Sequence, residues 1–113
     1  MTFADLLNYL QENSKYTVLD GDIMQTIAKT ESNTYENPLM GEIIKHLFAA
    51  VNAADVNAPI TRAQATTALG PLRLIYMKDD APVDGFRMLG RIIHTIDGAF
   101  NDEALHEKYR GQK

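Results

Sequence analysis

Apolar residues recur every three or four positions through most of this 113-residue chain. The clearest run would form one continuous stripe on a helix over residues 38–54: Met40, Ile43, Ile44, Leu47, Val51 and Ala54. This spacing buries one face of an α-helix, whereas a half-buried strand would alternate apolar and polar residues. No convincing pair of strands is present. The pattern therefore predicts an all-α fold of about five to seven helices, packed as a single compact bundle-like domain over residues 1–113.

Helix starts are marked by side chains that can accept hydrogen bonds from the first free backbone N–H groups. Three starts follow known capping patterns: Thr2 with Asp5, Asn37 with Pro38, and Thr61 with Gln64. For the helix that contains Ile23 and Ile27, we expect Thr17 or Asp20 to begin the helix. We also expect Asn101 to cap a last short helix at the end of the chain.

One segment leaves the type of secondary structure open. Gly70-Pro71 predicts a break or sharp kink, because proline lacks the backbone N–H and clashes with the preceding turn. The apolar run at residues 72–77 is then interpreted as a short helix, with a short buried strand as the alternative. The predicted core is drawn from the helical stripes: Leu6, Leu10, Ile23, Ile27, Ile43, Leu47, Val51, Leu69, Leu89, Ile93 and Ile96.

The composition is that of a folded protein without disulfide bonds. The hydrophobic fraction is 45%, which argues against a disordered chain, and the absence of cysteine excludes thiolate chemistry. The first residues lack the basic start and apolar run of a signal peptide. No window approaches the roughly 20 apolar residues that a membrane span needs. We therefore expect a cytoplasmic protein that does not interact with membranes.

The formal net charge of −4 is unevenly spread. Residues 1–57 contain eight acidic and three basic residues, a net charge of −5, whereas residues 58–113 contain seven acidic and eight basic residues, a net charge of +1. A domain that binds nucleic acid is usually basic over its surface, so nucleic acid is the less favoured partner. A local basic patch in the second half remains compatible with these charges.

Motifs for catalysis or cofactor binding are absent. The two serines lie outside any GxSxG sequence, and the glycines match neither phosphate-binding spacing. We interpret Gly90 as a position of close helix packing. Glu42 with His46, and His94 with Asp97, share a helix face within each pair, but solvated helices often contain such pairs. We therefore expect no catalytic residue, no metal site and no cofactor.

Residues 61–78 have the outline of a helix-turn-helix, with a capped helix, a glycine turn and a second helix that carries Arg73 and Lys78. The second helix is mostly apolar, where recognition of DNA bases needs polar side chains. Packing into the core is therefore the favoured interpretation of this segment.

Residues 81–100 contain the best candidate for a binding surface. On one helix, the apolar stripe would be Phe86, Leu89, Ile93, Ile96 and Phe100. Arg87, Arg91 and His94 would share the opposite side. If other helices cover these three residues, they form an internal electrostatic seam with the acidic first half. If they are exposed, the two guanidinium groups are suited to carboxylates or phosphates.

These observations predict a small protein–protein interaction module, such as a regulator, an inhibitor or an immunity-type protein. Arg87, Arg91 and His94 are its predicted partner-binding residues, and the expected partner is a protein with an acidic surface. Two alternatives stay open: a helix-turn-helix-like DNA-binding regulator that uses residues 61–78, and a small-ligand-binding or enzymatic helical domain. Self-association is also left open.

Overall fold

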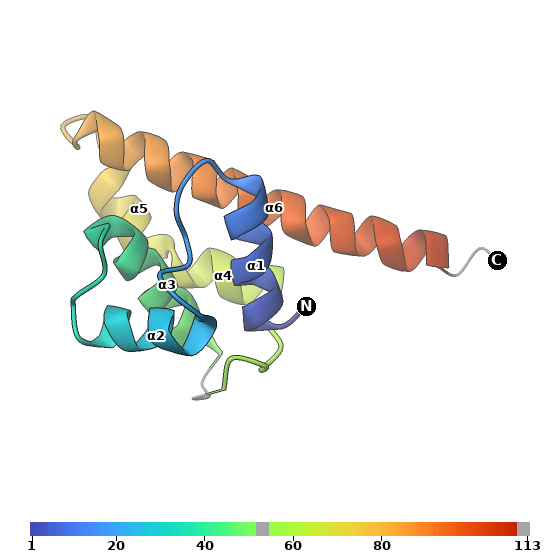
Figure 1. Ribbon diagram of the computed structural model, residues 1–113. Helices are drawn as coiled ribbons and strands as arrows, with labels where there is room; N and C mark the ends of the chain where they lie inside the picture. Colours follow the sequence, from blue (N-terminus) through green and yellow to red (C-terminus); the bar gives the residue numbers. More distant parts are fainter. Residues whose placement is uncertain (52–54, 111–113) are drawn as a thin grey trace.

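The computed structural model describes the backbone of residues 1–51 and 55–110, and the side chains of this part as far as residue 104. The described backbone forms six helices and no strand (Figure 1): α1 Phe3–Asn13, α2 Ile23–Glu31, α3 Pro38–Ala50, α4 Arg62–Ala68, α5 Gly70–Tyr76 and α6 Val83–Arg110. The prediction of an all-α, bundle-like fold is confirmed. The proposed continuation of α3 to Ala54 lies outside the described residues.

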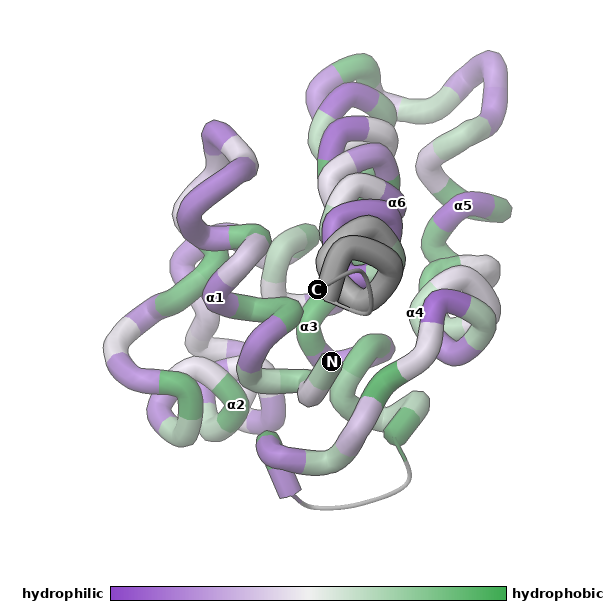
Figure 2. The backbone as a smooth tube through the Cα atoms, turned by 90° about the vertical axis from the view of Figure 1, so that its right-hand side faces the viewer, coloured by the Kyte–Doolittle hydropathy of each residue, from purple (hydrophilic) through white to green (hydrophobic). Residues whose placement is uncertain are grey.

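The long helix α6 organises the arrangement of the other helices. It contacts α1, α4 and α5, while α3 contacts α2 and α4. Figure 2 looks along α6 and shows α1 on one side of it and α4 and α5 on the other. With 28 residues, α6 is about 42 Å long at the usual helical rise. It runs past the other helices toward the C-terminus (Figure 1), and the molecule measures 49 Å along its longest axis.

All three predicted helix starts are confirmed. Thr2 with Asp5 and Thr61 with Gln64 form complete capping boxes, and Asn37 accepts hydrogen bonds from the Leu39 and Met40 backbone N–H groups. The N-terminal segment is also tied to the segment before α4. The Phe3 N–H donates to the Ala58 carbonyl, and the Ile60 N–H donates to the Met1 carbonyl, both at 2.9 Å.

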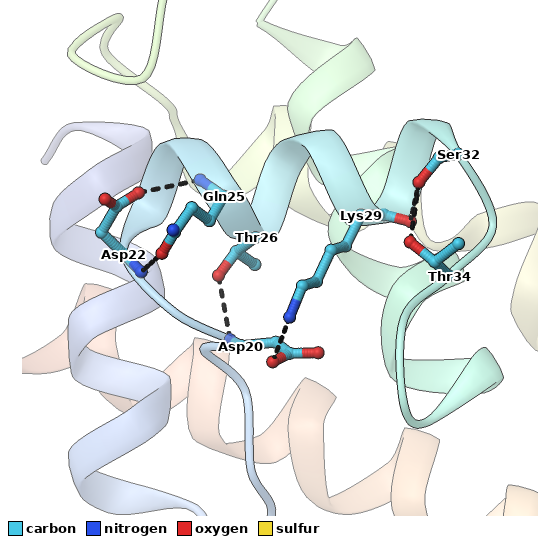
Figure 3. Close-up of polar contacts among 7 residues, drawn as sticks. All are labelled: Asp20, Asp22, Gln25, Thr26, Lys29, Ser32 and Thr34. Atoms are coloured by element: carbon cyan, nitrogen blue, oxygen red, sulfur yellow. Dashed lines mark hydrogen bonds and ion pairs between the residues drawn. The ribbon is translucent and has the colours of Figure 1, made fainter.

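The predicted start of α2 is wrong. Asp22, rather than Thr17 or Asp20, caps the helix, in a reciprocal capping box with Gln25 (Figure 3). Asp20 forms other contacts with α2. Its backbone N–H donates to the Thr26 hydroxyl at 2.9 Å, and its carboxylate accepts from the Lys29 ammonium at 2.7 Å. Asp20 thereby attaches the segment before α2 to the side of that helix.

The core prediction is confirmed except at two positions. Ile23 and Ile93 are only partly buried, while the other predicted core residues are buried. The buried side of α6 is centred on Leu89, Ile92 and Ile96, because α1 and the α4–α5 pair cover it from two directions. Phe86, predicted for the apolar stripe, is 49% exposed. It lies in the first turns of α6, beyond the region where the stripe is covered.

The predicted helix break near Gly70-Pro71 is confirmed, but the predicted start of a new helix at Asn101 is wrong. Leu69 separates α4 from α5, and residues 72–76 are helical, so the strand alternative is wrong. Asn101 lies inside α6 and caps no helix. Its side chain instead accepts a hydrogen bond from the Arg62 guanidinium of α4.

Alanine substitutions at two glycines of α6 should have opposite effects on the stability of the protein. An ideal Cβ on Gly85 would lie 2.6 Å from Tyr76 Cδ1, whereas one on Gly90 would meet only Met77 Cε at 3.6 Å, an ordinary contact. Close packing therefore requires Gly85 rather than Gly90. Gly90→Ala should stabilise the protein by about 1 kcal/mol through helix propensity. Gly85→Ala should destabilise it by about 1 kcal/mol or more through overpacking. Chemical denaturation of both variants checks the two signs.

Candidate functional site

The candidate surface lies on the outer side of α6. Arg87, Arg91 and His94 are separated by four and three positions, which places them on one face of the helix, and all three side chains are exposed. We call these three residues the α6 basic face. Within the described part of the chain, none of their side chains forms an ion pair or hydrogen bond with another side chain. The acidic neighbour Asp84 is also exposed and forms no ion pair with Arg87 there.

The α6 basic face is therefore not covered by the other described elements. An internal seam would require acidic side chains from the first half of the chain to lie against Arg87 and Arg91. The ion pairs that the structure does contain lie elsewhere, including one between the N-terminal ammonium and Glu103 at 2.7 Å. The exposure that a binding role requires is present, and the seam alternative lacks its covering groups in the described residues.

Exposed apolar residues lie beside the α6 basic face. Val83 precedes Arg87 by one helical turn and is 61% exposed, and Phe86 adjoins Arg87 in sequence. On α5, which packs against α6, Leu74 and Ile75 are also exposed. Helical spacing does not reveal that these residues are exposed, because Phe86 fits the apolar stripe of α6 and Leu74 and Ile75 belong to the apolar run at residues 72–77. The signal that could have identified them is their place at the two ends of the 77–82 turn, where few elements remain to cover them.

Arg62 shows how an arginine with a structural role differs from those of the α6 basic face. It reaches from α4 to α6, where its guanidinium lies 3.9 Å from the Asp97 carboxylate and 6.0 Å from the centre of the Phe100 ring. It also donates to the Asn101 side chain. These contacts join two helices, so Arg62 is engaged within the protein.

The helix-turn-helix outline of residues 61–78 does not produce a polar reading helix. Only Leu69 separates α4 from α5, and α5 presents Leu74 and Ile75 to solvent. Arg73 is the only basic residue within α5. An α-helix that reads base edges needs several hydrogen-bonding side chains, which this helix lacks.

The two carboxylate–histidine pairs do not converge into a metal site. His46 Nδ1 lies 3.8 Å from the Glu42 carboxylate and 2.9 Å from the Glu42 carbonyl oxygen, so the imidazole stays on its own helix. No ion pair joins His94 to Asp97 among the described side chains. In the same part of the chain, no three histidine, aspartate or glutamate residues are grouped so that they could hold a metal ion.

Residues in the described part of the chain line two hollows that are large enough to accept a small ligand. A shallow groove of about 700 Å³ between α3 and α4 is lined mainly by small apolar residues, including Ala49, Ala63 and Pro71. A cavity of about 430 Å³ lies between the segments that precede α2 and α3, and Tyr16, Asp20, Tyr35, Glu36 and Asn37 are among the residues that line it.

The chain matches no protein-family model, no curated protein and no solved structure. None of the helices, over the residues described, combines the length and the apolar character that crossing a membrane requires.

Proposed function

We propose that the protein is a protein-binding module whose α6 basic face engages an acidic surface on a partner protein. The observation that supports this function is the exposure of Arg87, Arg91 and His94 on one side of α6, without an internal partner in the described part of the chain. Arg62, in contrast, is engaged within the protein by Asp97 and Asn101 of α6. Unpaired arginines on a common face remain available for an external carboxylate.

The chemistry of the face favours a carboxylate-rich partner. Each guanidinium can donate two parallel hydrogen bonds to one carboxylate, a geometry that lysine cannot reproduce. The His94 imidazole adds a further hydrogen-bonding group beside the two guanidinium groups. The exposed Val83 and Phe86 supply apolar contact area beside the arginines. Aromatic residues, including phenylalanine, and arginine are among the residue types enriched in protein interfaces.

DNA binding by residues 61–78 is less well supported. The whole chain has a net charge of −4, and the exposed side of α5 is apolar at Leu74 and Ile75. Sequence-independent attraction to DNA comes from many phosphate contacts, which an acidic protein provides poorly.

Replacing Arg87 and Arg91 together with glutamate should weaken partner binding by about tenfold or more, because interface arginines contribute strongly to affinity. Folding stability should stay nearly unchanged, since exposed unpaired charges contribute little to it. Tagged wild-type protein and the double variant would be used for quantitative capture from lysate of the native cells. The protein that only the wild type recovers would then be purified and titrated against both, with thermal unfolding of each measured in parallel.

The matched control is Lys15→Glu with Lys45→Glu, which changes the net charge equally at two exposed positions outside the α6 basic face. This control should retain the partner. Equal retention by the Arg87/Arg91 variant, or a loss of stability without a change in the affinity of the folded protein, would contradict the proposal. Capture dominated by nucleic acid and lost steeply with added salt would favour the DNA-binding alternative instead.

A further inference from the structure

A shallow groove and an apolar projection lie next to each other on the side of the molecule formed by α3, α4 and α5. The groove of about 700 Å³ between α3 and α4 extends to α5, because Pro71 of α5 is among the residues that line it. Leu74 and Ile75 follow Pro71 by three and four residues, so they lie on the same side of α5 as Pro71. We call this hollow the α3–α4 groove, and we call Leu74 and Ile75 together the α5 knob.

The α5 knob is not covered by another described element. Leu74 is 72% exposed and Ile75 is 57% exposed, although Leu72 of the same short helix is buried. Figure 1 and Figure 2 both place α5 at an edge of the molecule. Large aliphatic side chains gain free energy when they leave water, and exposed apolar residues that lie together typically mark an interaction surface.

The α3–α4 groove is hollow because both helices present small side chains to it. Gln64, which also lines the groove, already uses its amide within the protein. Its Nε2 donates to the Ala50 carbonyl at 3.4 Å, and its Oε1 accepts from the Thr61 N–H at 2.8 Å. An aliphatic side chain can therefore enter the groove without leaving this amide unpaired. The small apolar residues of the lining are Ala49, Ala50, Ala63, Ala68 and Pro71.

The groove and the knob make this side of the molecule complementary to itself. Where a projection and a hollow lie side by side, a twofold axis can place the projection of each copy in the hollow of the other copy. The α3–α4 groove has room for both aliphatic side chains of the α5 knob. The two contacts across such an axis are identical, so the assembly closes at two chains.

The charges on this surface also suit a second copy. The chain has a net charge of −4, so two copies repel each other where acidic faces meet. Among the described residues, no aspartate or glutamate lines the α3–α4 groove, whereas Lys45 and His46 do. The turn that follows the α5 knob contains Lys78, Asp79 and Asp80, a net charge of −1. A groove with a basic lining therefore receives a knob that is followed by an acidic turn.

We propose that two copies of this chain associate about a twofold axis, with the α5 knob of each copy inserted into the α3–α4 groove of the other. No residue of the groove or the knob belongs to the α6 basic face, so the dimer is independent of the proposed partner binding. Each copy contributes only two large aliphatic side chains to the contact. We therefore expect reversible association with a dissociation constant in the micromolar range, as is typical of a small interface.

The test is sedimentation velocity of the full chain from micromolar to millimolar concentrations. The wild type should change from monomer to dimer over this range and form no larger species. Ile75→Asp places a carboxylate on the knob, and Ala49→Gln fills the groove. Each variant should weaken dimerisation by about tenfold or more, because each disrupts both apolar contacts of the dimer. An equimolar mixture of the two variants should associate more strongly than either variant alone, since one contact of the mixed dimer combines an intact knob with an intact groove.

Met24→Asp is the matched control, because Met24 lies on α2, is 62% exposed and does not line the groove. It should dimerise as the wild type does, and thermal unfolding at a micromolar concentration verifies that every variant is folded. A chain that stays monomeric at all concentrations would overturn the proposal and leave this surface to a different protein. Equal weakening by Ile75→Asp and Met24→Asp, species larger than a dimer, or a mixture that associates no better than its components would also overturn it.

Discussion

Leu47→Ala should lower the free energy of unfolding by about 2–5 kcal/mol, the range for a buried leucine whose removal leaves a cavity. Leu47 lies on α3 and is fully buried, with a relative exposure of 0%. It belongs to the buried side of α3, which packs between α2 and α4. Urea denaturation followed by circular dichroism measures the change.

Leu74→Ala is the matched control for this experiment. It makes the same chemical change on α5, at a side chain that is 72% exposed. Surface substitutions of this kind usually change stability by less than about 0.5 kcal/mol. A loss below that value for Leu47→Ala, or equal losses for the two variants, would refute the assignment of α3 as a central helix.

Raising the pH should destabilise the protein by about 3 kcal/mol through Tyr35 alone, the value of a pKa difference of about two units. Burial, with Asp20 and Glu36 nearby, raises the Tyr35 pKa in the folded state from 10.0 to about 12. A raised pKa means that the folded state keeps its proton while the unfolded chain releases it. The stability is therefore fully present below pH 10 and is lost as the pH rises toward 12.

The measurement is the free energy of unfolding as a function of pH for the wild type and for Tyr35→Phe. The wild type and Tyr35→Phe share every other titratable group, so the difference between the two curves isolates the contribution of Tyr35. At neutral pH, Tyr35→Phe should be at least as stable as the wild type, because it removes a buried hydroxyl that has no hydrogen-bond partner among the described residues. Parallel curves above pH 10 would contradict the burial of the hydroxyl.

Local features of the fold could be predicted because they depend on residues a few positions apart. The Thr61–Gln64 capping box and the Asn37-Pro38 start need only neighbouring backbone groups, and the Gly70-Pro71 break follows from the missing N–H of proline. The start of α2 was predicted wrongly from the local sequence, because Asp20 and Asp22 are both suitable N-cap residues. The choice between them follows from the contacts of Asp20 with Thr26 and Lys29 on the side of α2.

For the candidate sites, too, local features could be predicted and features that depend on packing could not. The common face of Arg87, Arg91 and His94 follows from helical spacing alone, but its exposure depends on where α1, α4 and α5 pack around α6. The cavity at Tyr35 could not be predicted, because its walls come from two segments that are separated by the whole of α2. Tyrosine in a loop with turn-forming residues gave no sequence signal of burial.

By itself, the sequence determined the helical periodicity, most of the caps and the pairing of residues on each helix face, since these depend on bonds and contacts within one or two turns. The tertiary structure alone decided which faces are covered. Phe86 and Leu89 fit the same apolar stripe, yet Phe86 is 49% exposed and Leu89 is fully buried. The physical reason is that a side chain is buried only where another element packs against it. Which element packs there depends on residues that are distant in the chain.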